Sequence, residues 1–142
     1  MAITYENVIY DRVIDSLHSL IANEFSIPIY FDNHDGNQSF LITPDVDSNI
    51  DTLATGQIRE VTVNISYELN DPGNYTKNNI KQVTEIKERL KRLLHNNKTY
   101  YADSGENKYR NGIVQSINYE REDDISRGVI IFSCQTMELI WK

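Results

Sequence analysis

The sequence predicts an α+β fold in which two main helices pack on a mainly antiparallel sheet of four to five strands. Two periodic segments carry this prediction. From Gln57 to Leu69, apolar and polar residues alternate, as they do in a strand with one buried face. From Ile80 to Leu94, apolar residues recur at intervals of three and four, which places them on one face of a helix. We expect these two apolar faces to meet in the core. Asp71-Pro72-Gly73 lies between the segments and indicates a tight reversal.

Length and composition limit the class of protein. The 142 residues predict a single domain, residues 1–142, that is large enough to bury a core. A net charge of −7 argues against a nucleic-acid-binding surface, which is normally basic. The single cysteine, Cys134, has no internal disulfide partner and is expected to be a buried structural thiol. Neither a signal peptide nor an apolar run of ~20 residues is recognised, so we expect a soluble, intracellular protein with no membrane contact.

The N-terminal third predicts a helix followed by a hairpin. An apolar stripe that ends near Asn23 indicates the helix, with Thr4 as its N-cap. Ile27–Phe31 and Phe40–Ile42 then read as two short strands around a turn that is rich in glycine and Asx residues. We expect these two strands to pair as a hairpin.

Two polar segments are expected to be long loops. Pro44–Gly56 is acidic and aperiodic, although an edge strand within it remains an alternative. Lys98–Asn111 carries three tyrosines, which either face a partner or pack onto the sheet as an anchor. Both segments are longer than ordinary connections, so we place partner contact on them. The candidate partner-binding residues are Asp45, Asp47, Asp51, Leu53, Tyr100, Tyr101 and Tyr109.

The end of the chain predicts two more strands, Ile113–Arg121 and Val129–Trp141. Val129–Phe132 is apolar on both faces, so the start of the last strand is expected to be covered on both sides. Lengths add a constraint. The strand 57–69 would span ~43 Å, whereas a compact domain of this size is only ~37 Å across. The strands must therefore bend or project, and projecting strands leave edges that a partner usually covers.

Motifs that carry chemistry are sparse. His34, in the turn 32–37, is the best metal candidate, but this turn lacks the glycine and glutamate spacing of a calcium loop, so a solvated turn is favoured. No nucleotide-binding loop or nucleophile elbow occurs. We expect no catalytic residue, cofactor or metal, and no enzymatic activity. The second helix is locally basic, which fits either a solvated face or a docking surface for an acidic partner.

In this order of elements, the chain resembles the tail terminator (tail completion) proteins of long-tailed bacteriophages. The helix containing Asp11-Arg12-Val13-Ile14-Asp15-Ser16-Leu17 leads directly to Ile27-Pro28-Ile29-Tyr30-Phe31-Asp32-Asn33, and this opening resembles the start of many of them. The strand Glu60–Leu69, the helix Tyr75–His95 and the two closing strands are similar in order and spacing. The likeness covers nearly the full length and consists of an arrangement rather than a catalytic motif.

The resemblance implies a structural virion protein of the tail–neck junction that is assembled in the host cytoplasm. It would form a homo-oligomeric ring, a hexamer, on the last ring of the tail tube protein. There it would stop tube polymerisation and bind a neck or connector protein, while DNA passes through the bore without specific binding. Two other classes remain open. One is another ring-forming neck or tail component, such as a head–tail adaptor. The other is a small ligand-binding or enzymatic domain, which a deep pocket with converging polar groups would favour.

Overall fold

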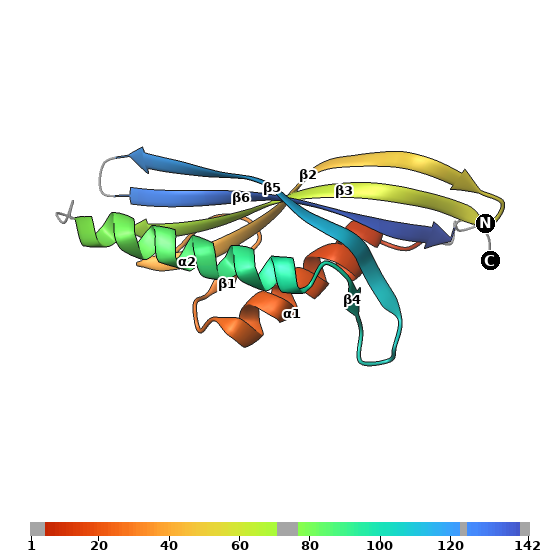
Figure 1. Ribbon diagram of the computed structural model, residues 1–142, viewed down its shortest axis with the longest axis horizontal. Helices are drawn as coiled ribbons and strands as arrows, with labels where there is room; N and C mark the ends of the chain where they lie inside the picture. Colours follow the sequence, from red (N-terminus) through yellow and green to blue (C-terminus); the bar gives the residue numbers. More distant parts are fainter. Residues whose placement is uncertain (1–4, 71–76, 123–124, 140–142) are drawn as a thin grey trace.

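The computed structural model describes residues 5–70, 77–122 and 125–139 (Figure 1). Thr4, Asp71-Pro72-Gly73 and Trp141, which the sequence analysis singled out, lie outside these residues. The described elements, in chain order, are the π-helical segment η1 (Ile9–Ile14), α1 (Asp15–Glu24), β1 (Ile29–Tyr30), β2 (Gln38–Leu53), β3 (Gly56–Asn70), α2 (Lys77–Asn96), β4 (Tyr100–Tyr101), β5 (Asn107–Glu122) and β6 (Ile125–Leu139).

The predicted fold class is wrong. Strands make up about half of the described residues and form one curled, mixed sheet of six strands, in place of a mainly antiparallel sheet of four to five. The strand order is β1-β2-β3-β6-β5-β4. The mixed character comes from β1, which pairs with β2 in parallel through Ile29↔Phe40 and Tyr30↔Leu41. The expected hairpin of these two segments therefore does not form.

The segment Pro44–Gly56, expected to be a loop, belongs almost entirely to the β2–β3 hairpin. β2 pairs with β3 along its whole length and reaches Leu53↔Gly56 at the tip. The register shifts at Asp45 and at Ile50, where β-bulges insert one extra residue each. Each bulge interrupts the alternation of side chains, and the residues from Pro44 to Thr52 are exposed on both faces, so the segment shows no period of burial. The edge-strand alternative is the one that the structure adopts.

The central strand and the closing strands are confirmed, and each is longer than predicted. β3 and β6 pair from Gly56↔Leu139 to Asn70↔Ile125 at the centre of the sheet. β5 already begins at Asn107, and β4 pairs with its first residues. The segment Lys98–Asn111 is consequently a short two-stranded extension of the sheet rather than a long loop.

The helices lie on one face of the sheet, as Figure 1 shows for α1 and α2. Alternate residues of β3 turn toward them and are fully buried, which confirms the predicted core between this strand and the second helix. The helix-free face differs from the prediction, because Val129 and Ile131 of β6 are only half-buried there. Among the described side chains, the buried apolar residues contributed by α1, α2 and β3 are Leu17, Ile21, Val83, Leu90, Leu94, Val61, Val63, Ile65, Tyr67 and Leu69.

Two long hairpins project in opposite directions (Figure 1). The β2–β3 hairpin ends at Leu53 and Gly56, and the β5–β6 hairpin ends at Glu122 and Ile125. The 15 residues of β3 span ~50 Å at the rise of an extended strand, before any curl is subtracted. The β2–β3 tip extends beyond the helices and is available for contact, whereas α2 runs alongside the β5–β6 hairpin as far as its tip (Figure 1).

Candidate assembly surface

The outer edge of β2 is open over most of its length. Within the described residues, β1 pairs only with Phe40 and Leu41, and no strand pairs with the outer side of β2 from Thr43 to Leu53. Every residue from Pro44 to Thr52 is exposed. Unpaired backbone N–H and C=O groups on such an edge form a template for another strand.

The four partner-binding candidates predicted in the segment Pro44–Gly56 lie on this open edge of β2: Asp45, Asp47, Asp51 and Leu53. Asp47 accepts a hydrogen bond from Arg59 Nε of β3 at 2.9 Å, and Arg59 also forms an ion pair with Glu138 of β6. The hydrogen bond to Asp47 is the main reason that the pKa of Arg59 lies above its usual value. Asp45 and Asp51 have no ion-pair partner among the described residues. Leu53 is the last residue before the turn.

The three tyrosine candidates have different environments. Tyr109 is fully buried and donates a hydrogen bond from its hydroxyl to the Asn97 carbonyl at 2.8 Å. Burial raises its pKa above the usual value. Tyr100 is half-buried and stacks on Tyr109 with 5.9 Å between ring centroids, whereas Tyr101 is 62% exposed. The anchor alternative therefore describes Tyr109, and Tyr101 is the ring that faces outward.

A second open edge belongs to β5, and the sequence analysis did not identify it. Among the described residues, the outer side of β5 pairs with β4 through Asn107 and Tyr109, and the Gly112 N–H bonds to the Lys98 carbonyl at 2.9 Å. From Ile113 to Glu122, no described strand pairs with that side. Ile113 itself is 60% exposed. The two open edges thus lie on opposite sides of the sheet and toward opposite ends.

A groove lies between the β5 edge and the C-terminal half of α2. It consists of two adjoining cavities of about 210 and 190 Å³. The first is lined by Glu88, Lys91, Arg92 and His95, and the second shares two of these and adds Leu94, Lys98, Gly112, Ile113 and Val114. In the described part of the chain, no ion pair involves Lys91, Arg92 or Lys98. The groove is therefore basic, with an open strand edge along one wall.

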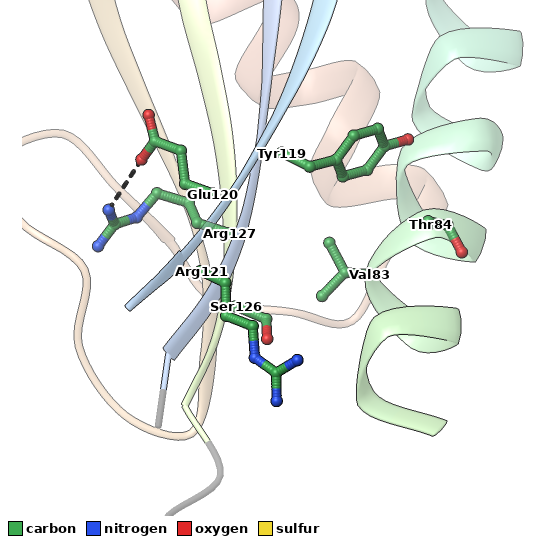
Figure 2. A pocket seen from close by; sticks show the side chains of 7 residues that line it. All are labelled: Val83, Thr84, Tyr119, Glu120, Arg121, Ser126 and Arg127. Atoms are coloured by element: carbon green, nitrogen blue, oxygen red, sulfur yellow. Dashed lines mark hydrogen bonds and ion pairs between the residues drawn. The ribbon is translucent and has the colours of Figure 1, made fainter. Parts of the chain in front are cut away.

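A further cavity of about 330 Å³ lies between α2 and the far end of the β5–β6 hairpin (Figure 2). Figure 2 shows the Tyr119 ring pointing from β5 toward Val83 and Thr84 of α2. On the other side of the hairpin, Arg127 forms an ion pair with Glu120 at 3.2 Å. Apolar side chains and a charged rim suit contact with another surface better than acid–base or nucleophilic chemistry.

His34, the metal candidate, lies against the helix-free face. Its Nδ1 is 2.7 Å from Ser39 Oγ, and its Nε2 is 3.0 Å from Ser66 Oγ. Burial lowers the pKa of His34, although Glu68 opposes this effect. The neutral ring holds the turn against β2 and β3, so the turn is bonded to the sheet rather than simply solvated. The described residues contain no cluster of three or more His, Cys, Asp or Glu side chains that is suited to a metal ion.

Two buried titratable groups belong to the core. Lys87 of α2 is fully buried and donates a hydrogen bond from Nζ to the Ile65 carbonyl at 2.9 Å. Its stem crosses β6 at Gly128, where a Cβ atom would lie 2.6 Å from Lys87 Cε. Burial lowers the pKa of Lys87 to about 7. Cys134 is buried as predicted, and burial raises its pKa to about 12.

No protein-family model matches this chain, and no curated protein matches it. Among the described helices, none is both long enough and apolar enough to cross a bilayer. Function is therefore inferred from the two open edges, the groove and the helix-free face.

Proposed function

We propose that this protein is a structural virion component, a tail terminator that forms a ring at the head-proximal end of a phage tail tube. The observation that carries the proposal is the pair of open strand edges, one on β2 and one on β5, at opposite sides of a single sheet. A sheet with two such edges is an assembly unit, because each edge leaves backbone hydrogen-bonding groups unsatisfied by its own chain.

The strand directions support assembly by repetition. The four long strands β2, β3, β6 and β5 alternate in direction across the sheet. A second copy that places its β2 beside β5 in the same orientation therefore continues an antiparallel sheet. Because the two edges are different surfaces, the contact is heterologous, and its repetition closes into a ring when the rotation between copies permits. A hexamer is the size that the resemblance implies.

The helix-free face supports a bore. Residues of the long strands that alternate onto this face include Glu60, Glu68, Glu120 and Glu122, against Arg110 and Arg127. Two of these glutamates, Glu68 and Glu120, form ion pairs with Arg127, so the face carries no excess of positive charge. Without such an excess it has little affinity for phosphate groups, and DNA would pass along it without specific binding. The helices would then lie on the outside of the ring.

The elements behind the resemblance are present in the expected order: a first helix, the strand β3, the helix α2 and the two closing strands. They support the tail-terminator assignment over a general assembly role. The partners would be the tail tube protein on one side of the ring and a neck or connector protein on the other. The protein would act without catalysis, first in the host cytoplasm and then in the virion.

The test is capping of tail tubes. The purified protein is mixed with tubes polymerised from the cognate tube protein, or with DNA-filled heads, and both mixtures are imaged by negative-stain electron microscopy. We expect a ring with a central hole at one end of each tube, no ring on heads, and no further tube growth after addition. Binding to heads alone would instead identify a head–tail adaptor. A strict monomer at millimolar concentration that binds neither structure would refute the ring.

A further inference from the structure

We propose that the open edge of β2 docks into the basic groove between α2 and β5 of a second copy of this chain. The inference rests on the proposed ring and specifies which two surfaces join. The docking segment is Thr43–Leu53. The receiving groove is the pair of adjoining cavities along α2, and Ile113 of β5 lines the second of them.

The charge of Thr43–Leu53 limits which strand edge of another copy can pair with it. Thr43–Leu53 contains Asp45, Asp47 and Asp51 and no lysine or arginine. Asp47 is already paired with Arg59, whereas Asp45 and Asp51 have no partner among the described residues. Two β2 edges placed side by side would bring like charges together, which destabilises strand pairing. Charge thus disfavours a symmetric dimer through β2.

The groove provides the complementary charge. Lys91, Arg92 and Lys98 line it together with His95, against the single carboxylate of Glu88. None of these three cations is neutralised by an ion pair in the described part of the chain. Opposite charges across an interface steer association and suppress wrong partners. An acidic strand edge is therefore the occupant that this groove fits.

Exposed apolar side chains provide the second contribution. Val46 and Ile50 on β2 are 51% and 46% exposed, and Ile113 at the groove is exposed to a similar extent. Docking would remove these side chains from water at the same time as it satisfies the two open backbone edges. The bulges at Asp45 and Ile50, together with Pro44, disrupt a regular edge and discourage pairing with unrelated strands. The edge thus favours a partner whose shape and charge match it.

Cysteine cross-linking tests the contact directly. Asn49→Cys on β2 and Gln115→Cys on β5 are both at exposed positions, and the native Cys134 is buried and unreactive. The two full-length variants are mixed and treated with a short thiol-specific cross-linker. We expect cross-linked dimers in the mixture and none with either variant alone. Dimers formed by Asn49→Cys alone would overturn the proposal, and so would oligomers in light scattering without any mixed cross-link.

Charge reversal with rescue tests the electrostatic part. Asp45→Lys/Asp51→Lys should weaken self-association at least about tenfold, as loss of close charge pairs does. Adding Lys91→Glu/Arg92→Glu should restore most of the lost affinity. The matched control is Asp11→Lys/Asp15→Lys, which makes the same change in net charge at exposed positions of η1 and α1. An equal loss in this control would show that net charge rather than the groove is responsible. The four changes together restore the net charge of −7, so a failure to rescue would show that Lys91 and Arg92 do not face Asp45 and Asp51.

The outcomes separate this inference from the proposed function. If the Asp45→Lys/Asp51→Lys variant still forms rings and caps tubes, docking of β2 into the groove is refuted, whereas the proposed tail-terminator function is retained. If rings assembled from the Asn49→Cys and Gln115→Cys variants show the mixed cross-link but never cap tubes, the proposed groove is right and the proposed function is wrong. A photoactivatable cross-linker attached to Gln115→Cys that joins the tube protein and never a second copy of this chain would assign the groove to the tube protein and overturn docking of a second copy.

Discussion

Replacing the buried lysine tests the energetics of the core most directly. Lys87 has a pKa of about 7 in the folded protein, against an ordinary value of 10.5 for the unfolded chain. Between these two values the unfolded chain binds more protons than the folded one, so the free energy of unfolding rises with pH. Below pH 7 both states are protonated, and the cost of burying the charge is constant. Lys87→Met removes the titrating group and keeps an unbranched stem of similar length against Gly128.

The magnitude follows from the two pKa values. At ~1.4 kcal/mol per pH unit, the full window is worth ~5 kcal/mol, and ~3 kcal/mol of it falls between pH 7 and pH 9.5. Urea unfolding followed by far-ultraviolet circular dichroism at these two pH values measures the effect. Wild type should gain ~3 kcal/mol more than Lys87→Met on going to pH 9.5. Other titrating groups, such as Cys134, cancel in this difference.

The control for this experiment is Lys91→Met, which makes the same chemical change at an exposed position of the same helix. It should retain the wild-type dependence on pH, because it leaves the buried Lys87 in place. If Lys87→Met and wild type gain equal stability between the two pH values, the ammonium group is solvated in the folded protein and our account of its burial is wrong.

The remaining predictions concern other parts of the fold. Ile65→Ala or Leu90→Ala should each lower the free energy of unfolding by about 2–5 kcal/mol in urea melts, since both side chains are fully buried, and an unchanged midpoint would contradict the core assignment. Tyr109→Phe should cost about 1 kcal/mol because it leaves the Asn97 carbonyl without its donor, whereas Tyr101→Phe should be neutral within ~0.5 kcal/mol. His34 should titrate below 6.5 by nuclear magnetic resonance. Because the pKa of His34 is lower in the folded state, its contribution to the free energy of unfolding should decrease as the pH falls below 6.5. A measured pKa at or above 6.5 would show that the ring is solvated.

The strand β3 and the helix α2 were predictable because their signals are local. One face of each packs on the core, so the period of burial appears directly in the order of residues. β2 is exposed on both faces from Pro44 to Thr52, so burial imposes no period there, and its bulges at Asp45 and Ile50 also interrupt the alternation of side chains. β1 is a two-residue strand and has no period at all. Its parallel pairing depends on the path of the turn around His34, which bonds to Ser39 and Ser66.

The partner-binding candidates also differ in how far local sequence predicts their position. Asp45, Asp47, Asp51 and Leu53 do lie together, although on a strand edge rather than on a loop. Tyr109 is internal because the start of β5 folds back onto the end of α2, a contact that its neighbours in sequence do not indicate. The groove forms where α2 meets β5. Its basic wall was visible in the sequence, but the open edge beside it was not.

By itself, the sequence determined the apolar faces of β3 and α2, the burial of Cys134 and the separation of an acidic segment near residue 47 from a basic one near residue 91. Tertiary structure alone decided which strand edges remain open and where the charge of Lys87 lies. Lys87 sits four residues after Val83 and three before Leu90, in the middle of the apolar stripe, yet its burial also requires Gly128 on a distant strand to leave room for its stem. Periodicity describes how one segment meets the core. An open edge or a buried charge depends on which distant segments come to lie beside it, and this is set by long-range pairing across the whole sheet.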